Sequence, residues 1–250
     1  MDALFEPLLW LYFALAPVTL VVLLFLTAPY GRHNRPGWGP QVPVRAGWLI
    51  MEIPTFLVFF PVYFMGAHRL SPVSLVLVGL WVLHYGYRTF LYPRRLETGG
   101  KRMPLLVALS GFGIQTLNSG LQAWWLGALG DYATAWLWDP RFVLGVALFG
   151  IGMVINHQSD NILLSLRAPG SSGYRIPRGG LFRFVSAPNY LGEILEWAGW
   201  ALATWSLPGL AFALYATSNL LPRALSNHRW YRETFPDYPP ERRALFPGLL

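Results

Sequence analysis

Residues 7–28 read PLLWLYFALAPVTLVVLLFLTA, a run of 22 residues without a charged side chain. A helix of about 20 apolar residues crosses the roughly 30 Å of hydrocarbon in a bilayer, so this stretch predicts a membrane-spanning helix. The residues before it include the acids Asp2 and Glu6 and no basic residue, unlike the positively charged start of a signal peptide. We therefore expect the stretch to remain in the mature protein.

Six further apolar stretches make the chain an all-α, polytopic membrane protein with seven predicted transmembrane helices. The seven spans are expected at residues 7–28, 46–66, 71–92, 104–127, 141–159, 189–206 and 207–222. Composition agrees, because 54% of the residues are hydrophobic and 12% are charged, whereas soluble domains carry about 25% charge. The last two spans are short and meet at Leu207-Pro208, which predicts a tight helical hairpin. We expect a single domain over residues 1–250.

The basic residues predict how the chain is oriented. Sixteen of the 19 Lys and Arg residues fall in the loops after the first, third and fifth spans and in the carboxyl-terminal tail. Because basic loops stay in the cytoplasm, the amino terminus is expected outside and the carboxyl terminus inside. The net charge of +7 is then a signal of topology, and its spread over four segments does not indicate nucleic-acid binding.

Cysteine and histidine usage excludes several chemistries. The chain has no cysteine, which rules out disulfides, cysteine-ligated zinc and thiol catalysis. Its five His residues are scattered without an HExxH or similar spacing, so no metal site is expected.

Polar groups occur within the apolar second half of the chain. There are four: Asn156 with Asp160; Tyr174-Arg175; Asn189 with Glu193 and Glu196; and His228-Arg229-Trp230-Tyr231. The first and third groups have the i, i+4 and i, i+4, i+7 spacings of single helix faces. They could hydrogen-bond between helices and bind nothing. Ionisable groups inside a membrane usually mark a functional site, however, and four such groups in one half of the chain favour a charged ligand.

The neighbouring arginines indicate that this ligand is a nucleotide. Arg167, Arg175, Arg223 and Arg229 can pair with phosphates, while Asn and acidic side chains suit ribose hydroxyls and a carboxamide. Neither a GxGxxG nor a GxxxxGK[ST] pattern is present, which excludes a Rossmann fold and a P-loop. The nucleotide is therefore expected to bind among the transmembrane helices.

Several runs closely resemble the steroid 5-alpha-reductase family in order and spacing. They are YRIPRGGLF (174–182), NYLGEILEW (189–197), ALATWSLP (201–208) and HRWY (228–231). The resemblance is dense from Asn156 to Pro247. Shorter motifs agree before it, namely YGRH (30–33), EIP (52–54) and HYGYRTF (84–90). The short chain is typical of a bacterial member, which would place it in the inner membrane as an integral, multi-pass protein.

The resemblance implies a reductase that uses NADPH to reduce the 4,5 double bond of 3-oxo-Δ4 steroids. Residues 1–127 would supply the substrate and catalytic helices, with Glu52 and Tyr85 as the catalytic pair, and residues 141–250 would bind the cofactor. The implied cofactor contacts are Tyr30, Asn156, Asp160, Arg167, Tyr174, Arg175, Asn189, Glu193, Trp197, Arg223, Asn227 and Tyr231. Two positions depart from the family pattern. Asn227 stands where a histidine contact is usual, and Met51 replaces a polar residue beside the glutamate.

The residues themselves support a role for the Glu52 and Tyr85 pair. Glu52 is the only acid in its span, and a lone carboxyl in an apolar site favours its neutral form, which can donate a hydrogen bond. Tyr85 is a donor at neutral pH. Two donors on the C3 oxygen would stabilise the enolate that forms when hydride reaches C5, before C4 is protonated. Alternatively, Tyr85 belongs to an aromatic belt and Glu52 only caps a kink, which fits less well with His84 and Arg88 nearby.

Three other functions remain open at this point. The protein could reduce an enoyl thioester or a polyprenol. It could be an isoprenylcysteine-type methyltransferase using S-adenosylmethionine, whose Asn/His-Pro-x-Tyr-x-Gly-Glu pattern is echoed by APNYLGE (187–193). It could also be a lipid binder without activity. We expect a monomer whose steroid substrate enters from the lipid, with no nucleic-acid partner.

Overall fold

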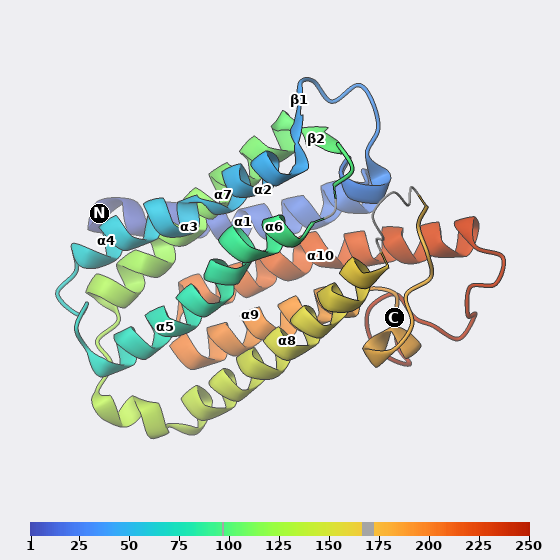
Figure 1. The fold of residues 1–250 in the computed structure, drawn as a ribbon. Coiled ribbons are helices and arrows are strands. Elements are labelled where there is room, and N and C mark those ends of the chain that lie inside the picture. The colour runs from blue at the N-terminus through green and yellow to red at the C-terminus, as the bar shows by residue number, and fades with distance from the viewer. Residues whose placement is uncertain (97, 167–172) are drawn as a thin grey trace.

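The computed structural model describes residues 1–96, 98–166 and 173–250 of the chain. It is mostly helical, and the long helices lie side by side in one bundle (Figure 1). The amino terminus lies at one end, and the carboxyl terminus lies at the end where β1, β2 and the last turns of α10 gather.

The long helical segments follow the predicted spans in order. They are α1 (Asp2–Phe25); α2 (Val44–Glu52), α3 (Pro54–Leu57) and α4 (Phe59–Phe64); α5 (Pro72–Gly86) with a π-helical turn (Tyr87–Leu91) and α6 (Tyr92–Arg95); α7 (Leu105–Trp124) with a π-helical turn (Trp125–Leu129); α8 (Pro140–Ser165); α9 (Pro188–Thr204); and α10 (Leu207–Thr234). Three of the described segments are long and apolar enough to cross a membrane: Asp2–Phe25, Val44–Phe64 and Pro140–Ser165.

Short elements connect these helices. Single 3-10 turns occur at Gly31–His33, Thr134–Trp138 and Gly180–Arg183. The strands β1 (Gln41–Pro43) and β2 (Arg102–Pro104) pair antiparallel, with Val42 opposite Met103. An isolated bridge between Val185 and Arg243 ties the carboxyl-terminal segment to the chain just before α9.

Two predicted helix ends were too early. α8 continues to Ser165 rather than ending at 159, and α10 continues to Thr234 rather than ending at 222. The fourth polar group, His228 to Tyr231, therefore lies on a helix and not in a tail. Hydropathy marks only the apolar part of a helix, whereas hydrogen bonding along the backbone continues into its polar part.

The second predicted span is also interrupted. Pro54 begins α3 directly after Ile53, because proline has no backbone N–H to continue the hydrogen bonding of α2. The break comes directly after Glu52, whose side chain is 7% exposed.

The predicted hairpin between the last two spans is confirmed as a tight turn. Only Trp205 and Ser206 separate α9 from α10, and Trp205 adopts a left-handed conformation with φ 44°. The Ser206 hydroxyl accepts a hydrogen bond from Gly209 N at 3.1 Å and so caps α10. Of the two helices, α10 is not short, because it runs for 28 residues.

Glycines bring α8 and α9 into backbone contact. A Cβ on Gly152 would lie 2.4 Å from Glu196 N, and one on Gly192 would lie 2.5 Å from Asn156 N. Gly145 and Gly199 meet in the same way one heptad away. Small residues allow this close approach of helices in membranes. The contact sets the first and third polar groups against each other.

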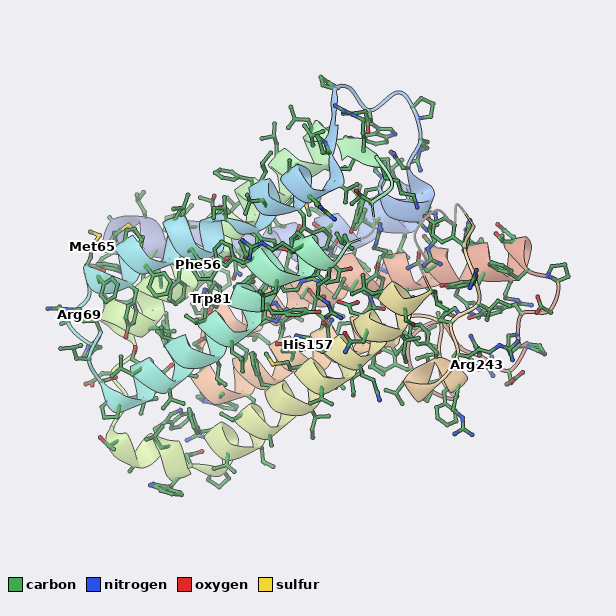
Figure 2. All side chains as sticks on the ribbon, in the orientation of Figure 1. Phe56, Met65, Arg69, Trp81, His157 and Arg243 are labelled. Atoms are coloured by element: carbon green, nitrogen blue, oxygen red, sulfur yellow. The ribbon has the colours of Figure 1, made fainter. Side chains whose placement is uncertain are left out.

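Aromatic side chains fill the centre of the bundle. Trp81, Trp197 and Trp200 are almost completely buried, and their rings lie within 5.7 to 6.4 Å of one another. Trp81 on α5 lies between the end marked by Arg69 and the end marked by Arg243 (Figure 2). This core is where helices from both halves of the chain meet.

Candidate active site

Glu52 and Tyr85 lie on different helices and are joined through Gln115 of α7. Gln115 Nε2 donates to Glu52 Oε2 at 3.0 Å, and the Tyr85 hydroxyl lies 3.4 Å from both polar atoms of the same amide. Asn118 Nδ2 lies 3.5 Å from the Tyr85 hydroxyl. The predicted catalytic pair therefore shares one buried polar cluster, with Gln115 between its members.

Sequence reasoning missed this contribution of α7. Gln115, Asn118 and Gln122 are spaced three and four residues apart within a predicted span, which places them on one helix face. They escaped notice because no ionisable residue accompanies them in α7, whereas Asn156 and Asn189 each share a helix face with an acid. Their spacing alone does not separate a site from a contact between helices.

Aromatic rings form one wall beside the pair. The Tyr85 ring lies 4.4 Å from Trp81 and 5.6 Å from Trp197, measured between centroids. Trp197, predicted as a cofactor contact, is 1% exposed and packs edge-on against His84 at 4.5 Å. Because Trp197 belongs to α9, the wall joins the Tyr85 ring to the helix that carries Asn189 and Glu193.

His84 and Glu196 form a buried pair behind this wall. His84 Nδ1 lies 2.6 Å from Glu196 Oε1, and both side chains are less than 5% exposed. The pair links α5 of the front half to α9 of the second half. Glu196 thus has a partner within the protein, in contrast to the ligand-facing role that its helix face suggested.

Arg88 is a second link between the two halves. Its guanidinium lies 3.8 Å from Asp160 of α8 and 3.8 Å from Glu193 of α9. Its charge also rests over the ring of Trp48 at 4.7 Å. Arg88, which the sequence singled out only as a neighbour of Tyr85, is the cation that acids of the first and third polar groups surround.

Asn156 and Asp160 share one face of α8, as their spacing predicted, and Asn189 of α9 lies against them. Asn156 Nδ2 donates to the backbone oxygen of Asn189 at 2.9 Å, and Asn189 Nδ2 lies 3.5 Å from Asp160 Oδ1. Asn156 and Asp160 are each 2% exposed, while Asn189 and Glu193 are half-buried. The half-buried amide and carboxylate are accessible to a ligand.

Arg223 of α10 is the buried cation of the predicted phosphate site. Its Nε donates to the Tyr190 hydroxyl at 2.8 Å, and its charge lies 3.5 Å from the centroid of the Tyr30 ring. Its Nη1 is buried and has no hydrogen-bond partner among the described residues. A buried guanidinium nitrogen without a partner fits an anionic ligand, because leaving such a group unpaired is costly.

Asn227, which stands where the family pattern has a histidine, forms a hydrogen bond with a histidine from elsewhere in the chain. Its Oδ1 lies 3.0 Å from His33 Nε2. Burial lowers the pKa of His33, although the hydrogen bond to Asn227 raises it and nearby arginines lower it further. The ring is therefore mainly neutral at pH 7. An imidazole is thus supplied next to Asn227 by the loop after α1.

Arg32 lies among three aromatic rings at the same end of the bundle. Its guanidinium carbon is 4.4 Å from the ring centre of Tyr231, 4.7 Å from Trp230 and 5.4 Å from Tyr174. Its Nη1 is buried without a hydrogen-bond partner among the described residues. The structure thus brings Tyr174 and Tyr231 to a second cation with a free donor.

The remaining predicted arginines are placed differently. Arg175 is exposed on the segment before α9, and Arg229 is exposed on α10, so neither is buried in the polar cluster. Arg167 lies outside the described residues. Within residues 1–96, 98–166 and 173–250, no three His, Asp or Glu side chains are placed to hold a metal ion.

Comparison with known proteins identifies the family that carries this site. A family model described as 3-oxo-5-alpha-steroid 4-dehydrogenase matches residues 101–250. A steroid 5-alpha-reductase of Gossypium hirsutum is 45% identical over 247 residues, which cover 97% of this chain and 95% of the relative. The chain belongs to the steroid 5-alpha-reductase family. It is therefore a member of a family of oxidoreductases that act on steroids.

Animal members of the 5-alpha-reductase family are similar to this chain as well. The 3-oxo-5-alpha-steroid 4-dehydrogenase 1 of Bos taurus is 42% identical over 99% of this chain and 97% of the relative. The protein of the same name from Macaca fascicularis is 45% identical over 88% of this chain and 84% of the relative. The similarity to the reductases extends over the front half of the chain, which carries Glu52 and Tyr85, as well as the second half.

Proposed function

We propose that the protein is a multi-pass membrane reductase that uses NADPH to saturate the 4,5 double bond of 3-oxo-Δ4 steroids. The observation that carries this proposal is the cluster of Glu52, Gln115 and Tyr85, set against an aromatic wall that leads to Asn189 and Glu193. Two donors at one point suit the carbonyl oxygen of an enone.

The roles of the catalytic residues follow from this geometry. The neutral Glu52 carboxyl and the Tyr85 hydroxyl donate hydrogen bonds to the C3 oxygen of the substrate. They thereby draw electrons from the double bond, make C5 electrophilic and hold the enolate oxygen until C4 takes up a proton. NADPH, when bound, supplies the hydride that C5 receives.

The cofactor site uses the polar groups of the second half. Asn189 and Glu193 suit the carboxamide of a nicotinamide, and Arg223 and Arg32 suit phosphate oxygens, since each has a buried nitrogen without a protein partner. Asn156, Asp160 and Arg88 hold Asn189 and Glu193 in place through their mutual contacts. Tyr174, Tyr231 and Asn227 would complete the phosphate end, together with Tyr30.

Replacing Arg223 tests the phosphate role. Arg223→Met should weaken NADPH binding by about 10- to 100-fold, because a hydrogen bond to a charged group contributes about 1.5–3 kcal/mol. Tryptophan quenching, recorded during titration with NADPH, measures the affinity. Arg232→Met, an exposed position of the same helix, is the matched control and should bind NADPH normally. Equal affinities in the two variants would exclude Arg223 from the cofactor site.

An apolar groove supports entry of the steroid from the lipid. It has a volume of about 700 Å³ and lies between α1 and α7, lined by residues that include Leu8, Leu15, Gly113, Leu117 and Tyr215. Helix α7, which forms one side of the groove, also carries Gln115.

The groove can be narrowed at one position without disturbing the fold. A Cβ on Gly113 would meet no atom within 4 Å, yet the residue lines the groove. Gly113→Leu should therefore raise KM for the steroid about tenfold or more, equivalent to about 1.4 kcal/mol, and leave NADPH affinity unchanged. Gly79→Leu, at an exposed and equally open position of α5, controls for the added side chain. An unchanged KM in Gly113→Leu would rule out this entry route.

The proposed topology has the amino terminus outside and the basic end of the bundle in the cytoplasm. The loops with Arg32, Lys101 and Arg243 lie at the same end of the bundle as the carboxyl terminus (Figure 1). Because the chain lacks cysteine, single cysteines report accessibility without background. A cysteine at Lys101 should react only from the cytoplasmic side, and one at Ala67 only from the other. Labelling from the same side would refute the topology.

The deciding experiment measures NADPH consumption with testosterone or progesterone in detergent or lipid, with the product identified by mass. A gain of two hydrogens at the 4,5 bond supports the proposal. Turnover only with enoyl or polyprenol substrates would move the protein to those reactions. Quenching by S-adenosylmethionine and not by NADPH would favour a methyltransferase. If neither compound quenched the fluorescence, a lipid binder would be favoured.

A further inference from the structure

A row of side-chain amides runs through the bundle to Glu52. Trp200 Nε1 donates to Gln122 Oε1 at 3.0 Å, Gln122 Nε2 to Asn118 Oδ1 at 3.2 Å, and Asn118 Nδ2 to Gln115 Oε1 at 3.3 Å. The row ends with Gln115 Nε2 donating to Glu52 Oε2 at 3.0 Å. Asn118, Gln122 and Trp200 are at most 1% exposed. Water therefore does not compete for the bonds among these three residues, and Gln115 at the end of the row is half-buried.

The far end of this amide row has only one possible direction. The Trp200 indole can donate but not accept, and it faces Gln122 Oε1. The backbone oxygen of Pro208 can accept but not donate, and it takes a bond from Gln122 Nε2 at 2.8 Å. The Gln122 amide would break both bonds if it flipped. Its orientation is therefore set by the protein and not by the assignment of similar atoms.

That direction passes along the row. Because Gln122 presents an N–H to Asn118, the oxygen of Asn118 must face it and its NH₂ must face Gln115. The same step turns the Gln115 oxygen toward Asn118 and its NH₂ toward Glu52. Hydrogen bonds in such rows polarise one another, which strengthens the last donor.

We infer that Gln115 is the positioning residue of the active site, and that the amide row makes it donate to one oxygen of Glu52 so that the carboxyl proton resides on the other. The inference rests on the proposed function, in which Glu52 donates to the substrate. With Oε2 occupied as an acceptor, Oε1 is the oxygen that carries the proton toward the C3 carbonyl. Tyr85, 3.4 Å from the same amide, is held at a fixed separation from Glu52.

The neighbourhood of Glu52 explains why α7 supplies this donor. The adjacent Met51 has no hydrogen-bond donor, and its side chain packs over Gly111, where a Cβ would lie 2.7 Å from the Met51 Cγ. This close approach of α2 and α7 occurs one turn before Gln115. Because Met51 offers Glu52 no hydrogen bond, the amide of Gln115 on α7 supplies one.

Two substitutions at Gln115 distinguish positioning from packing. Gln115→Met keeps the length of the side chain and removes the donor. It should lower kcat by about tenfold or more, the loss expected for a displaced catalytic group, while NADPH affinity stays the same. Gln115→Glu has the same shape and can donate only when it is protonated. Its kcat relative to wild type should therefore rise as the pH falls, whereas that of Gln115→Met should stay flat. Wild-type kcat in Gln115→Met, or parallel pH profiles of the two variants, overturns the inference.

An infrared measurement tests the same inference without any substrate. The carbonyl stretch of the neutral Glu52 carboxyl, assigned by its disappearance in Glu52→Gln, should move to higher frequency in Gln115→Met because a donor to its oxygen is lost. An unchanged frequency, or a wild-type protein without this band, overturns the inference. Failure of steroid turnover by wild type would instead refute the proposed function, and the infrared shift would still decide the role of Gln115.

Discussion

Tyr85→Phe should lower kcat for a 3-oxo-Δ4 steroid by about 10²–10³-fold, the usual loss for one donor to a developing oxyanion. Only the hydroxyl is removed, so the ring still packs against Trp81 and Trp197 and the fold should persist. NADPH should bind with unchanged affinity, because the hydroxyl bonds to amides of α7 and to no group of the cofactor site. Initial rates at saturating NADPH and steroid measure the effect.

Glu52→Gln should produce a comparable loss by a related route. The amide keeps the volume of the carboxyl, but its N–H is a far weaker acid and polarises the substrate oxygen less. The control for both changes is Tyr63→Phe, which removes a buried hydroxyl bonded to Arg69 O and to Ser74 near the other end of the bundle. It should cost about 1 kcal/mol of stability and leave kcat intact. A wild-type rate from either Glu52→Gln or Tyr85→Phe would remove that residue from the chemistry.

Gly152→Ala should have the largest effect on stability. The added Cβ would lie 2.4 Å from Glu196 N and 2.5 Å from Gly192 O, and both atoms are backbone, so α8 and α9 must move apart. Overpacking of this kind costs about 1–3 kcal/mol. The separation would also disturb the contact between Asn156 and Asn189, so NADPH affinity should fall together with the unfolding temperature. Thermal unfolding in detergent and NADPH titration measure the two effects.

Gly150→Ala is the matched control on the same helix. A Cβ there meets no atom within 4 Å, so the variant should be at least as stable as wild type. If Gly150→Ala and Gly152→Ala unfolded at the same temperature, the close contact of α8 and α9 would not be a source of stability.

Sequence reasoning located the helices because each has a long apolar stretch, and it failed where helices continue as polar ones. For this reason the predicted spans left out the last turns of α8 and α10. That Asn156 shares a face with Asp160, and Asn189 with Glu193, was predictable, because helical spacing places residues on one face regardless of the rest of the fold. Which faces meet was not predictable from spacing, so the pairing of His84 with Glu196 and the position of Arg88 between Asp160 and Glu193 required the structure.

The amides of α7 illustrate a second limit. Gln115, Asn118 and Gln122 are neutral, and a neutral amide in an apolar helix has no sequence signature that separates a site residue from a contact between helices. Its meaning comes from its partners, and those partners are Glu52, Trp200 and Pro208, all distant in the sequence. The resemblance to the family identified the catalytic pair and the cofactor contacts. It did not identify the amide row that connects the catalytic pair to the core.

The backbone contact between α8 and α9 has a consequence for how the membrane acts on this protein. A contact between backbones has no rotamers to adjust, so a thicker or stiffer bilayer can tilt the pair only as one body. The groove between α1 and α7, lined by long flexible side chains such as those of Met1 and Leu8, can instead change shape with the surrounding acyl chains. Lipid composition should therefore alter the apparent affinity for the steroid and leave that for the nucleotide constant.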